Sequence, residues 1–263
     1  MIDVAVLGVG LIGPGLPDWA GGQALLRDPA SWQRLTTAVP LPGRLPPTER
    51  RRAGTVVKAS VVVADEAVAA AGADAAQLAT VFTSSTGDPV NCHLLCEALA
   101  APERMVSPTR FTNSVHNAAA GYWHIATQSR QPSTSLAAFD ASFAAGLLEA
   151  AVQCLSTGQP VLLVACDVPY PEPLHALRPV ADVFAVALVL APHASMGRAL
   201  RLEVLGDVAA TACADAALDE VRRTIPAARA LPLLQALARG VADSVVLEGL
   251  PGMALRLQVG VST

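Results

Sequence analysis

Five cysteines and one neighbouring histidine raise the question of metal binding. Cys92 and Cys96 are four residues apart with His93 between them, and thiolates and imidazoles are common zinc ligands. A zinc site of this kind needs a second pair of ligands, and the sequence offers none at suitable spacing. We therefore expect no metal and predict that the cysteines are small buried side chains. Their odd number and irregular spacing are typical of a protein of the reducing cytoplasm.

The segment Gly8-Val9-Gly10-Leu11-Ile12-Gly13 has the letters of the dinucleotide-binding fingerprint and follows an apolar run. That site needs a helix that begins at the third glycine, so that its N–H groups face the pyrophosphate. Pro14, Gly15 and Pro17 follow instead, and no helical periodicity begins before about Arg51. We expect a glycine-rich turn at the end of a first strand, and no nucleotide cofactor.

His116 and His124 are candidates for a general base and are eight residues apart. A general base must reach the group that it deprotonates, and no cysteine or serine nearby is arranged for that purpose. Ser142 follows Asp140 by two positions, without the Gly-x-Ser-x-Gly context of a hydrolase elbow. We predict that the two histidines pack or hydrogen-bond, and that the chain is not a serine hydrolase.

The composition limits the classes of protein to which the chain can belong. Of 263 residues, 52% are hydrophobic and 15% charged, the mean hydropathy is +0.45 and the formal net charge is −4. Such a chain is too apolar to be disordered. One lysine, Lys58, and 4% aromatic residues offer neither a basic field nor a stacking surface for nucleic acid. We expect some of the apolar surface to be buried against a partner.

Neither a membrane span nor a signal peptide is expected. The longest apolar runs, residues 136–155 and 181–192, contain acidic residues, and a span needs about 20 mostly uncharged apolar residues. Residues 1–4 contain no basic segment of the kind that opens a signal peptide.

Apolar strands alternate with helical patterns, which predicts a layered α/β sheet in one domain. The expected strands are residues 2–8, 78–84, 133–138, 160–166, 184–190 and 200–206, with a closing hairpin at 245–247 and 253–259. The expected helices are residues 51–72, 88–99, 113–128, 140–157, 215–223 and 231–239. The Gly- and Pro-rich residues 10–49 read as a long loop.

Three stretches together resemble the β-ketoacyl synthases, which are condensing enzymes with a thiolase-type fold. They are the opening strand and turn at 4–14, residues 107–111 followed by 117–121, and the strand and turn at 131–140. More narrowly, residues 111–117 with 121–123, 146–151 and 171–174 are similar to the short ketosynthase-like chain length factors of aryl polyene gene clusters. The resemblance covers residues 1–191 well and the tail weakly.

In active members of this family a strand ends in a cysteine at a helix start, where the dipole and free N–H groups lower the pKa of its thiol. The resemblance places Asp140 at that position, and a carboxylate is a poor substitute for a thiolate in forming an acyl thioester. We expect Asp140 to cap the helix that follows, which typically stabilises it by about 1 kcal/mol. A residual chemical role is the alternative.

The family also uses two histidines from the second half of the fold, and no histidine follows His193. The resemblance thus implies a ketosynthase-like N-terminal half at 1–195, and a truncated C-terminal half at 196–263 that completes the same domain. With the nucleophile and both histidines missing, we expect no catalytic residue and no independent condensation.

The function implied is that of a non-catalytic chain length factor. It would form a heterodimer with an active β-ketoacyl synthase and shape its acyl tunnel while a carrier-protein-bound polyene is extended, without a cofactor. The implied interface and tunnel residues are Leu94, Leu95, Phe111, His116, Asn117, Ser135, Ala137 and Phe139.

The densest basic run, Arg50-Arg51-Arg52, is either a solvated helix start or a contact for an acidic acyl carrier protein. Two other functions stay open. The chain could be a decarboxylase or acyltransferase that uses Asp140, or a scaffold that recruits the carrier protein.

Overall fold

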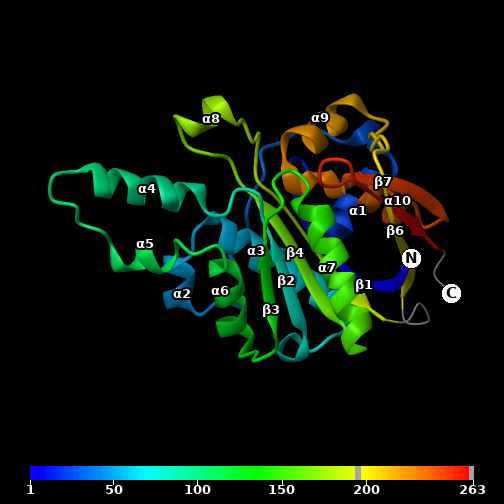
Figure 1. Cartoon of the computed structure of the whole chain (residues 1–263), viewed down its shortest axis with the longest axis horizontal. Coiled ribbons are helices and arrows are strands. Elements are labelled where there is room, and N and C mark those ends of the chain that lie inside the picture. Colours follow the sequence, from blue (N-terminus) through cyan, green and yellow to red (C-terminus); the bar gives the residue numbers. More distant parts are fainter. Residues whose placement is uncertain (193–196, 261–263) are drawn as a thin grey trace.

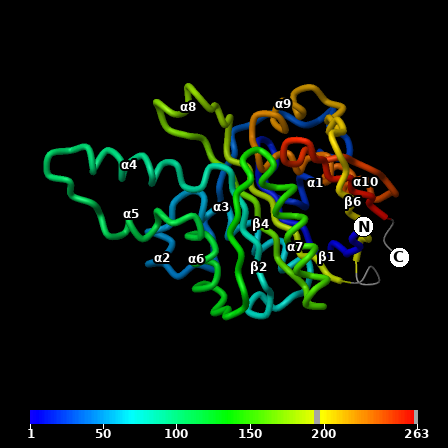
Figure 2. Tube along the Cα trace, viewed as in Figure 1, coloured from blue at the N-terminus to red at the C-terminus, as the bar shows by residue number. Residues whose placement is uncertain are grey.

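The computed structural model describes residues 1–192 and 197–260, which build one mixed sheet (Figure 1). Its strand order is β3-β2-β4-β5-β1-β6-β8-β7, with β2 parallel to both β3 and β4 and all other pairs antiparallel. The strands are β1 (Ile2–Ile12), β2 (Ala79–Thr83), β3 (Ser133–Leu136), β4 (Val161–Asp167), β5 (Phe184–Ala191), β6 (Arg198–Leu205), β7 (Asp243–Glu248) and β8 (Ala254–Val259). In Figure 2 the last strands, in yellow to red, lie near the blue N-terminal end.

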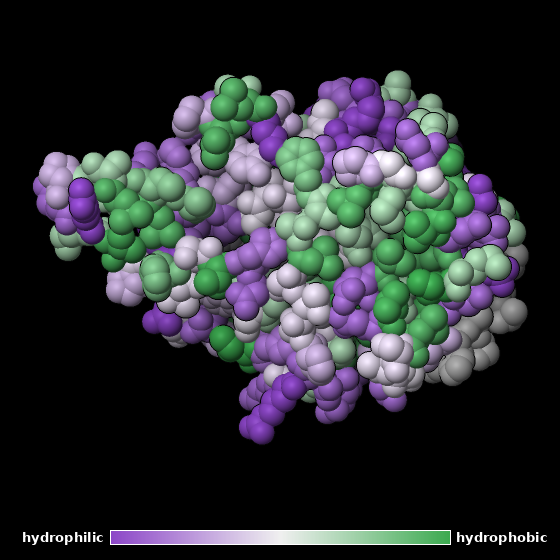
Figure 3. All heavy atoms as spheres, viewed as in Figure 1, coloured by the Kyte–Doolittle hydropathy of each residue, from purple (hydrophilic) through white to green (hydrophobic). Residues whose placement is uncertain are grey.

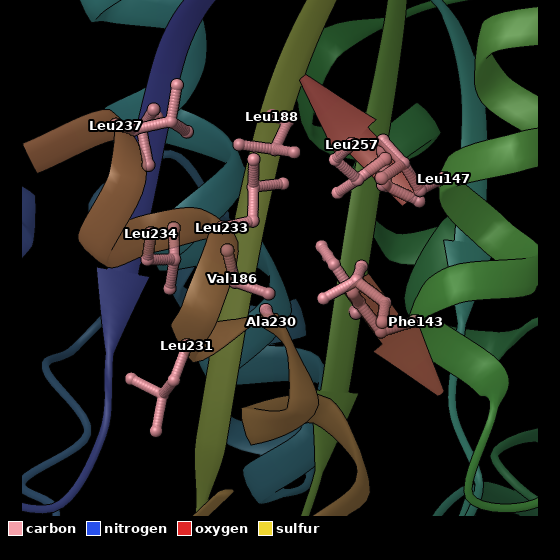
Figure 4. Packing of buried hydrophobic residues seen from close by; sticks show 14 of the residues in the cluster. Phe143, Leu147, Val186, Leu188, Ala230, Leu231, Leu233, Leu234, Leu237 and Leu257 are labelled. Carbon is pink, nitrogen blue, oxygen red and sulfur yellow. The ribbon is translucent and has the colours of Figure 1, made fainter. Parts of the chain in front are cut away.

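Helices cover both faces of this sheet, which confirms the expected layered α/β architecture. One face carries α3 (Thr55–Ala71) and α6 (Ala118–Thr127), and the other carries α1 (Trp19–Arg27), α7 (Ser142–Thr157) and α10 (Leu231–Arg239). Figure 4 shows leucines of α10 packed against Val186 and Leu188 of β5. Strands β4 and β5 are buried at every residue, because helices cover both of their faces.

The glycines at the start of the chain serve helix packing. A β-carbon on Gly10 would lie 1.9 Å from the carbonyl oxygen of Val63, and one on Gly8 would lie 2.1 Å from that of Ala67. Both glycines lie inside β1, so the predicted turn at these positions is wrong, and the turn after the strand begins at Gly13. The missing side chains let the backbone of α3 lie directly on β1.

Several helix boundaries differ from those expected from the sequence. Residues 10–49 contain α1, whose N-cap Asp18 accepts a hydrogen bond from the N–H of Gly21. Residues 51–72 divide at Ala53 and Gly54 into α2 (Pro47–Arg52) and α3. Residues 113–128 are a helix only from Ala118, and α5 (Pro108–Thr112) precedes it. The prolines and glycines in these segments are typical of loops, so the sequence did not predict the short helices. A proline is nevertheless compatible with the first turn of a helix.

The remaining expected helices and the closing hairpin are present. They are α4 (Pro89–Ala100), α7, α9 (Ala216–Thr224), α10 and the β7–β8 pair. Two short segments matter below, α8 (Leu174–Leu177) and the 3-10 helix η4 (Pro226–Ala230). Among the described residues, no helix is long and apolar enough to cross a bilayer.

Candidate functional site

A sharp elbow joins the edge strand β3 to α7, and Ser142 fixes its backbone. The Ser142 hydroxyl donates to the carbonyl of Phe139 at 2.6 Å and accepts from the N–H of Ala138 at 3.0 Å. Phe139 has a φ of +51°, in the left-handed region that residues other than glycine rarely adopt. The elbow is therefore a tight turn whose backbone geometry is held from the first turn of α7.

Asp140, the next residue of the elbow, is an ion-paired side chain and not a helix cap. The N-cap position of α7 is Ala141, and no side chain caps it. Arg178 Nη2 donates to Asp140 Oδ1 at 2.7 Å, and Arg229 Nη2 donates to Oδ2 at 3.0 Å. The predicted capping role is wrong, because two arginines from distant segments take both carboxylate oxygens. Guanidinium groups bind carboxylate oxygens through short, charge-assisted hydrogen bonds.

The two arginines also bind side chains other than Asp140. Arg178 follows α8 and donates to the hydroxyl of Ser85 at 2.6 Å. Arg229, in η4, also pairs with Glu248 at the end of β7. The cluster of Asp140, Arg178, Arg229 and Glu248 thus balances two acids with two bases. It joins the elbow to the β4–β5 connection and to the C-terminal segment.

Phe139 points its ring outward beside this cluster. The ring is stacked against Arg178, whose guanidinium carbon lies 3.6 Å from its centroid. Phe139 is nevertheless 67% exposed. The guanidinium covers the ring without removing it from the surface, which is a cation–π arrangement.

The cysteines divide into two groups. Cys154, Cys166 and Cys213 are buried as predicted, but Cys92 and Cys96 on α4 are exposed, so the prediction fails for these two. Burial raises the pKa of the Cys154 thiol to about 11 and of Cys213 to about 12, and it also raises the pKa of Cys166. Partial desolvation and the neighbouring Cys96 raise the pKa of Cys92. Raised pKa values leave little thiolate at neutral pH. Within residues 1–192 and 197–260, no group of three possible ligands could hold a metal ion.

His116 and His124 lie along the edge of the sheet. His116 Nε2 is 3.3 Å from the carbonyl oxygen of Ser84, and His124 Nε2 is 3.2 Å from the hydroxyl of Thr80. Burial lowers the pKa of His124. Both histidines line an open groove of about 580 Å³, together with Asn117, Ala120, Gly121, Ser133 and Ser135. The structure thus brings together three of the predicted interface residues, His116, Asn117 and Ser135, while His193 lies outside the described residues.

The outer edge of β3 pairs with no strand among the described residues. The N–H groups of Thr80 and Ser84 donate to the carbonyls of Pro132 and Leu136. Backbone groups of successive strand residues point to opposite sides, so those of Ser133 and Ser135 face away from β2. Ala137 follows this edge and is exposed. An open edge of this kind is a template for pairing with a second chain.

Residues 88–117, hereafter the arm, project away from the sheet and carry α4 and α5 (Figure 1). Their surface holds large apolar side chains, visible as green spheres on the left of Figure 3. The most exposed are Val90, Leu99, Met105, Phe111 and Val115. Leu94 and Leu95 are half-buried on α4. Clustered apolar surface on a projecting segment marks an interaction site.

A cationic cavity of about 560 Å³ opens at the start of α3. Arg51 and Arg52 line it together with Arg110 of α5, which was not among the predicted residues. Only the fold brings Arg110 to this place, since it is distant from the arginine run in the sequence. Arg50 turns elsewhere, because its Nη2 donates to the carbonyl of Leu45. One acid, Asp88, also lines the cavity, and burial raises the pKa of its carboxyl group.

Comparison with known families and structures gives one family and one fold. A family model described as beta-ketoacyl synthase, N-terminal domain, matches residues 24–245. No curated protein matches the chain at a significant level.

Solved structures similar to the chain include the ketosynthase ApeO in complex with its chain length factor ApeC from Xenorhabdus doucetiae. That match has 21% identity and a TM-score of 0.76, over 98% of this chain and 100% of that one. The ishigamide ketosynthase/chain length factor matches with 15% identity and a TM-score of 0.76, over all of both chains. AntDE:AntF, a type II acyl-carrier protein in complex with its ketosynthase, matches with 12% identity and a TM-score of 0.74, over 99% of each chain. These similarities confirm the predicted thiolase-like fold.

Proposed function

The chain belongs to the β-ketoacyl synthase family, and we propose that it is a chain length factor. In this role it forms a heterodimer with a catalytic ketosynthase in the cytoplasm and shapes the tunnel in which a carrier-protein-bound polyene grows. Residues 196–263 are then a shortened second half of the ketosynthase fold. The resemblance to aryl polyene chain length factors and the likeness to complexes such as ApeO with ApeC support this proposal.

The observation that carries the proposal is the state of Asp140. Its two oxygens accept hydrogen bonds from Arg178 and Arg229. The negative charge of the carboxylate is therefore balanced by the arginines, and both oxygens already have hydrogen-bond partners. Forming an acyl thioester needs an activated thiol. Three of the five cysteines are buried, and the exposed Cys92 and Cys96 lie on α4, not at the nucleophile position of the family, which Asp140 holds. The condensing thiolate must then come from another subunit. The same ion pairs disfavour the alternative that Asp140 itself supports decarboxylation or acyl transfer, because both would need a free carboxylate.

The partner is expected to pair with the open edge of β3, adding its own strand to the sheet. This edge, the groove beside His116 and His124, and the apolar arm provide backbone groups and apolar surface for such an interface. Phe111 on the arm is 70% exposed in the single chain. A heterodimer would bury it.

Within the pair, we place Leu94 and Leu95 of α4 at the end of the partner's acyl tunnel. Side chains at a tunnel end limit the growing chain by steric contact. Larger residues there should stop extension earlier, and smaller ones should allow further cycles. A pure scaffold that only recruits the carrier protein would show neither effect.

We assign carrier-protein contact to the arginines around the cationic cavity. This assignment keeps Arg51 and Arg52, which the sequence predicted, and adds Arg110. Arg50 is expected to contribute less, because its guanidinium donates to the carbonyl of Leu45. Guanidinium groups suit the carboxylates and the phosphodiester of an acyl carrier protein.

The heterodimer is tested by expressing the tagged chain in its source organism, identifying the ketosynthase that co-purifies, and measuring the mass of the complex by light scattering. Ser135→Pro removes one N–H from the open edge while leaving the bonds to β2 in place, so it should abolish the complex and leave the chain folded. The matched variant Ser135→Val keeps that N–H and should still form the complex. A wild-type chain that co-purifies with no ketosynthase contradicts the proposal.

A further inference from the structure

The ring of Phe139 is linked to Asp140 through Arg178. We infer that Asp140 is a positioning residue, which uses Arg178 to hold this ring toward the acyl tunnel of the partner subunit. The inference rests on the proposed function. It explains why an acid stands at this elbow, where neither a cap nor a nucleophile is found.

The backbone of Phe139 is held in a costly conformation. A φ of +51° at a phenylalanine persists only where surrounding contacts impose it. Here the contacts come from Ser142, whose hydroxyl bonds to the carbonyl of Phe139 and to the N–H of Ala138. The direction in which the side chain leaves the backbone is therefore set before any partner binds.

The ring itself is held by Arg178. The guanidinium is fixed at Nη2 by two acceptors, Asp140 Oδ1 at 2.7 Å and Ser85 Oγ at 2.6 Å. Its plane can then support the ring at 3.6 Å. Arg229 holds the second oxygen of Asp140, so the carboxylate cannot turn away from Arg178. Without Asp140, Arg178 would keep only the serine hydroxyl, and the ring would lose a fixed support.

The position of the elbow indicates which ligand contacts this ring. Phe139 lies three residues after the last residue of β3, whose outer edge is open. Pairing of that edge with the partner brings the elbow to the shared surface, where an apolar acyl chain is the ligand. A rigid, exposed phenyl ring is a steric limit for such a chain, whereas a mobile ring would yield to it. Preorganisation of this kind is what separates a sharp length limit from a diffuse one.

The test is the length distribution of the products made by the complex of this chain with its co-purified ketosynthase. The probes are malonyl-loaded and acyl-loaded carrier protein, and the products are read by mass spectrometry. Phe139→Ala should lengthen the main product by at least one extension cycle. Asp140→Asn should broaden the distribution, with several-fold more of the longer product, whereas Asp140→Glu should largely restore the wild-type distribution. Glu220→Gln breaks an exposed ion pair with Arg34 outside this cluster and should leave the distribution unchanged.

Unchanged product length with Phe139→Ala, or an unchanged distribution with Asp140→Asn in a stable complex, would overturn the inference. If Asp140→Asn does not assemble, Arg178→Lys replaces it, since lysine keeps the charge but cannot stack as a planar fork, and a wild-type distribution with that variant also overturns the inference. A wild-type pair that makes no product contradicts the proposed function itself, and the inference falls with it.

Discussion

Asp140 and Arg229, 89 residues apart in the chain, join the elbow before α7 to the C-terminal segment through a hydrogen bond of 3.0 Å. The carboxylate also accepts from Arg178. One acid therefore ties together three segments that no sheet contact connects directly.

Removing this acid should destabilise the fold. Asp140→Ala leaves two arginines without their shared counterion, and because the site is partly exposed we expect a loss of about 1–2 kcal/mol of unfolding free energy. Chemical denaturation followed by circular dichroism measures it. The control is Asp3→Ala, which breaks an exposed pair with Arg201 and should lower the stability much less, because solvent screens exposed pairs. Equal losses in both variants would contradict the account of the cluster.

The glycine spacing in β1 makes a sharper prediction. Gly10→Ala places a β-carbon 1.9 Å from the Val63 carbonyl oxygen, so α3 must move from the sheet and the chain should lose more than about 3 kcal/mol or fail to fold. Gly121→Ala is the matched control, because nothing lies within 4 Å of its β-carbon and alanine favours a helix by about 1 kcal/mol. Thermal unfolding should show a large loss for the first variant and no loss for the second.

Burial of His124 should make stability depend on pH. Its pKa is lowered from the ordinary value of 6.5, so the unfolded chain binds the proton more readily than the folded one. The contribution of His124 is therefore complete above about pH 6.5 and is lost as the pH falls from there through the lowered pKa of the folded state. His124→Gln should flatten the stability profile between pH 7 and 5. Profiles that run parallel for the two proteins would contradict this assignment.

Carrier-protein binding should depend on the cavity at the start of α3. Arg51→Gln and Arg110→Gln each remove one charge from the pair's docking surface, and each should weaken carrier binding about threefold to tenfold at low salt, with a shallower salt dependence. Arg201→Gln, in β6 and outside the residues that line the cavity, is the control and should bind as the wild type does. Titration calorimetry with holo carrier protein at two ionic strengths measures both effects, and unchanged affinity in both cavity variants would refute the docking site.

Local pattern was enough to predict the layers of this fold. The continuous apolar runs of β4 and β5 and the apolar periodicity of α3 predict a sheet covered on both faces. A strand that is buried on both sides has apolar residues at every position and no alternation with polar ones. The short helix α1 was not predicted, because its glycines and the neighbouring prolines are typical of loops. The glycines of β1 match the sequence motif of a dinucleotide-binding site. Only the structure shows that they allow the backbone of α3 to pack directly on β1.

The candidate site was less accessible to sequence reasoning. Family resemblance marked Asp140 and Phe139, but the partners of Asp140 lie 38 and 89 residues away, and no local pattern links them. For the same reason Arg110 was missed, and Cys92 and Cys96 were assigned to the core although α4 stands away from it. Predictions based on neighbouring residues fail where tertiary contact decides the role of a side chain.

A condensation assay tests the central claim most directly. The purified chain, its co-purified ketosynthase and the complex of the two are each given malonyl- and acyl-loaded carrier protein, and carbon–carbon bond formation is followed by mass spectrometry. The account predicts extended product from the complex, none from the isolated chain, and none from a complex whose ketosynthase has lost its active cysteine. Extended product from the isolated chain would contradict it.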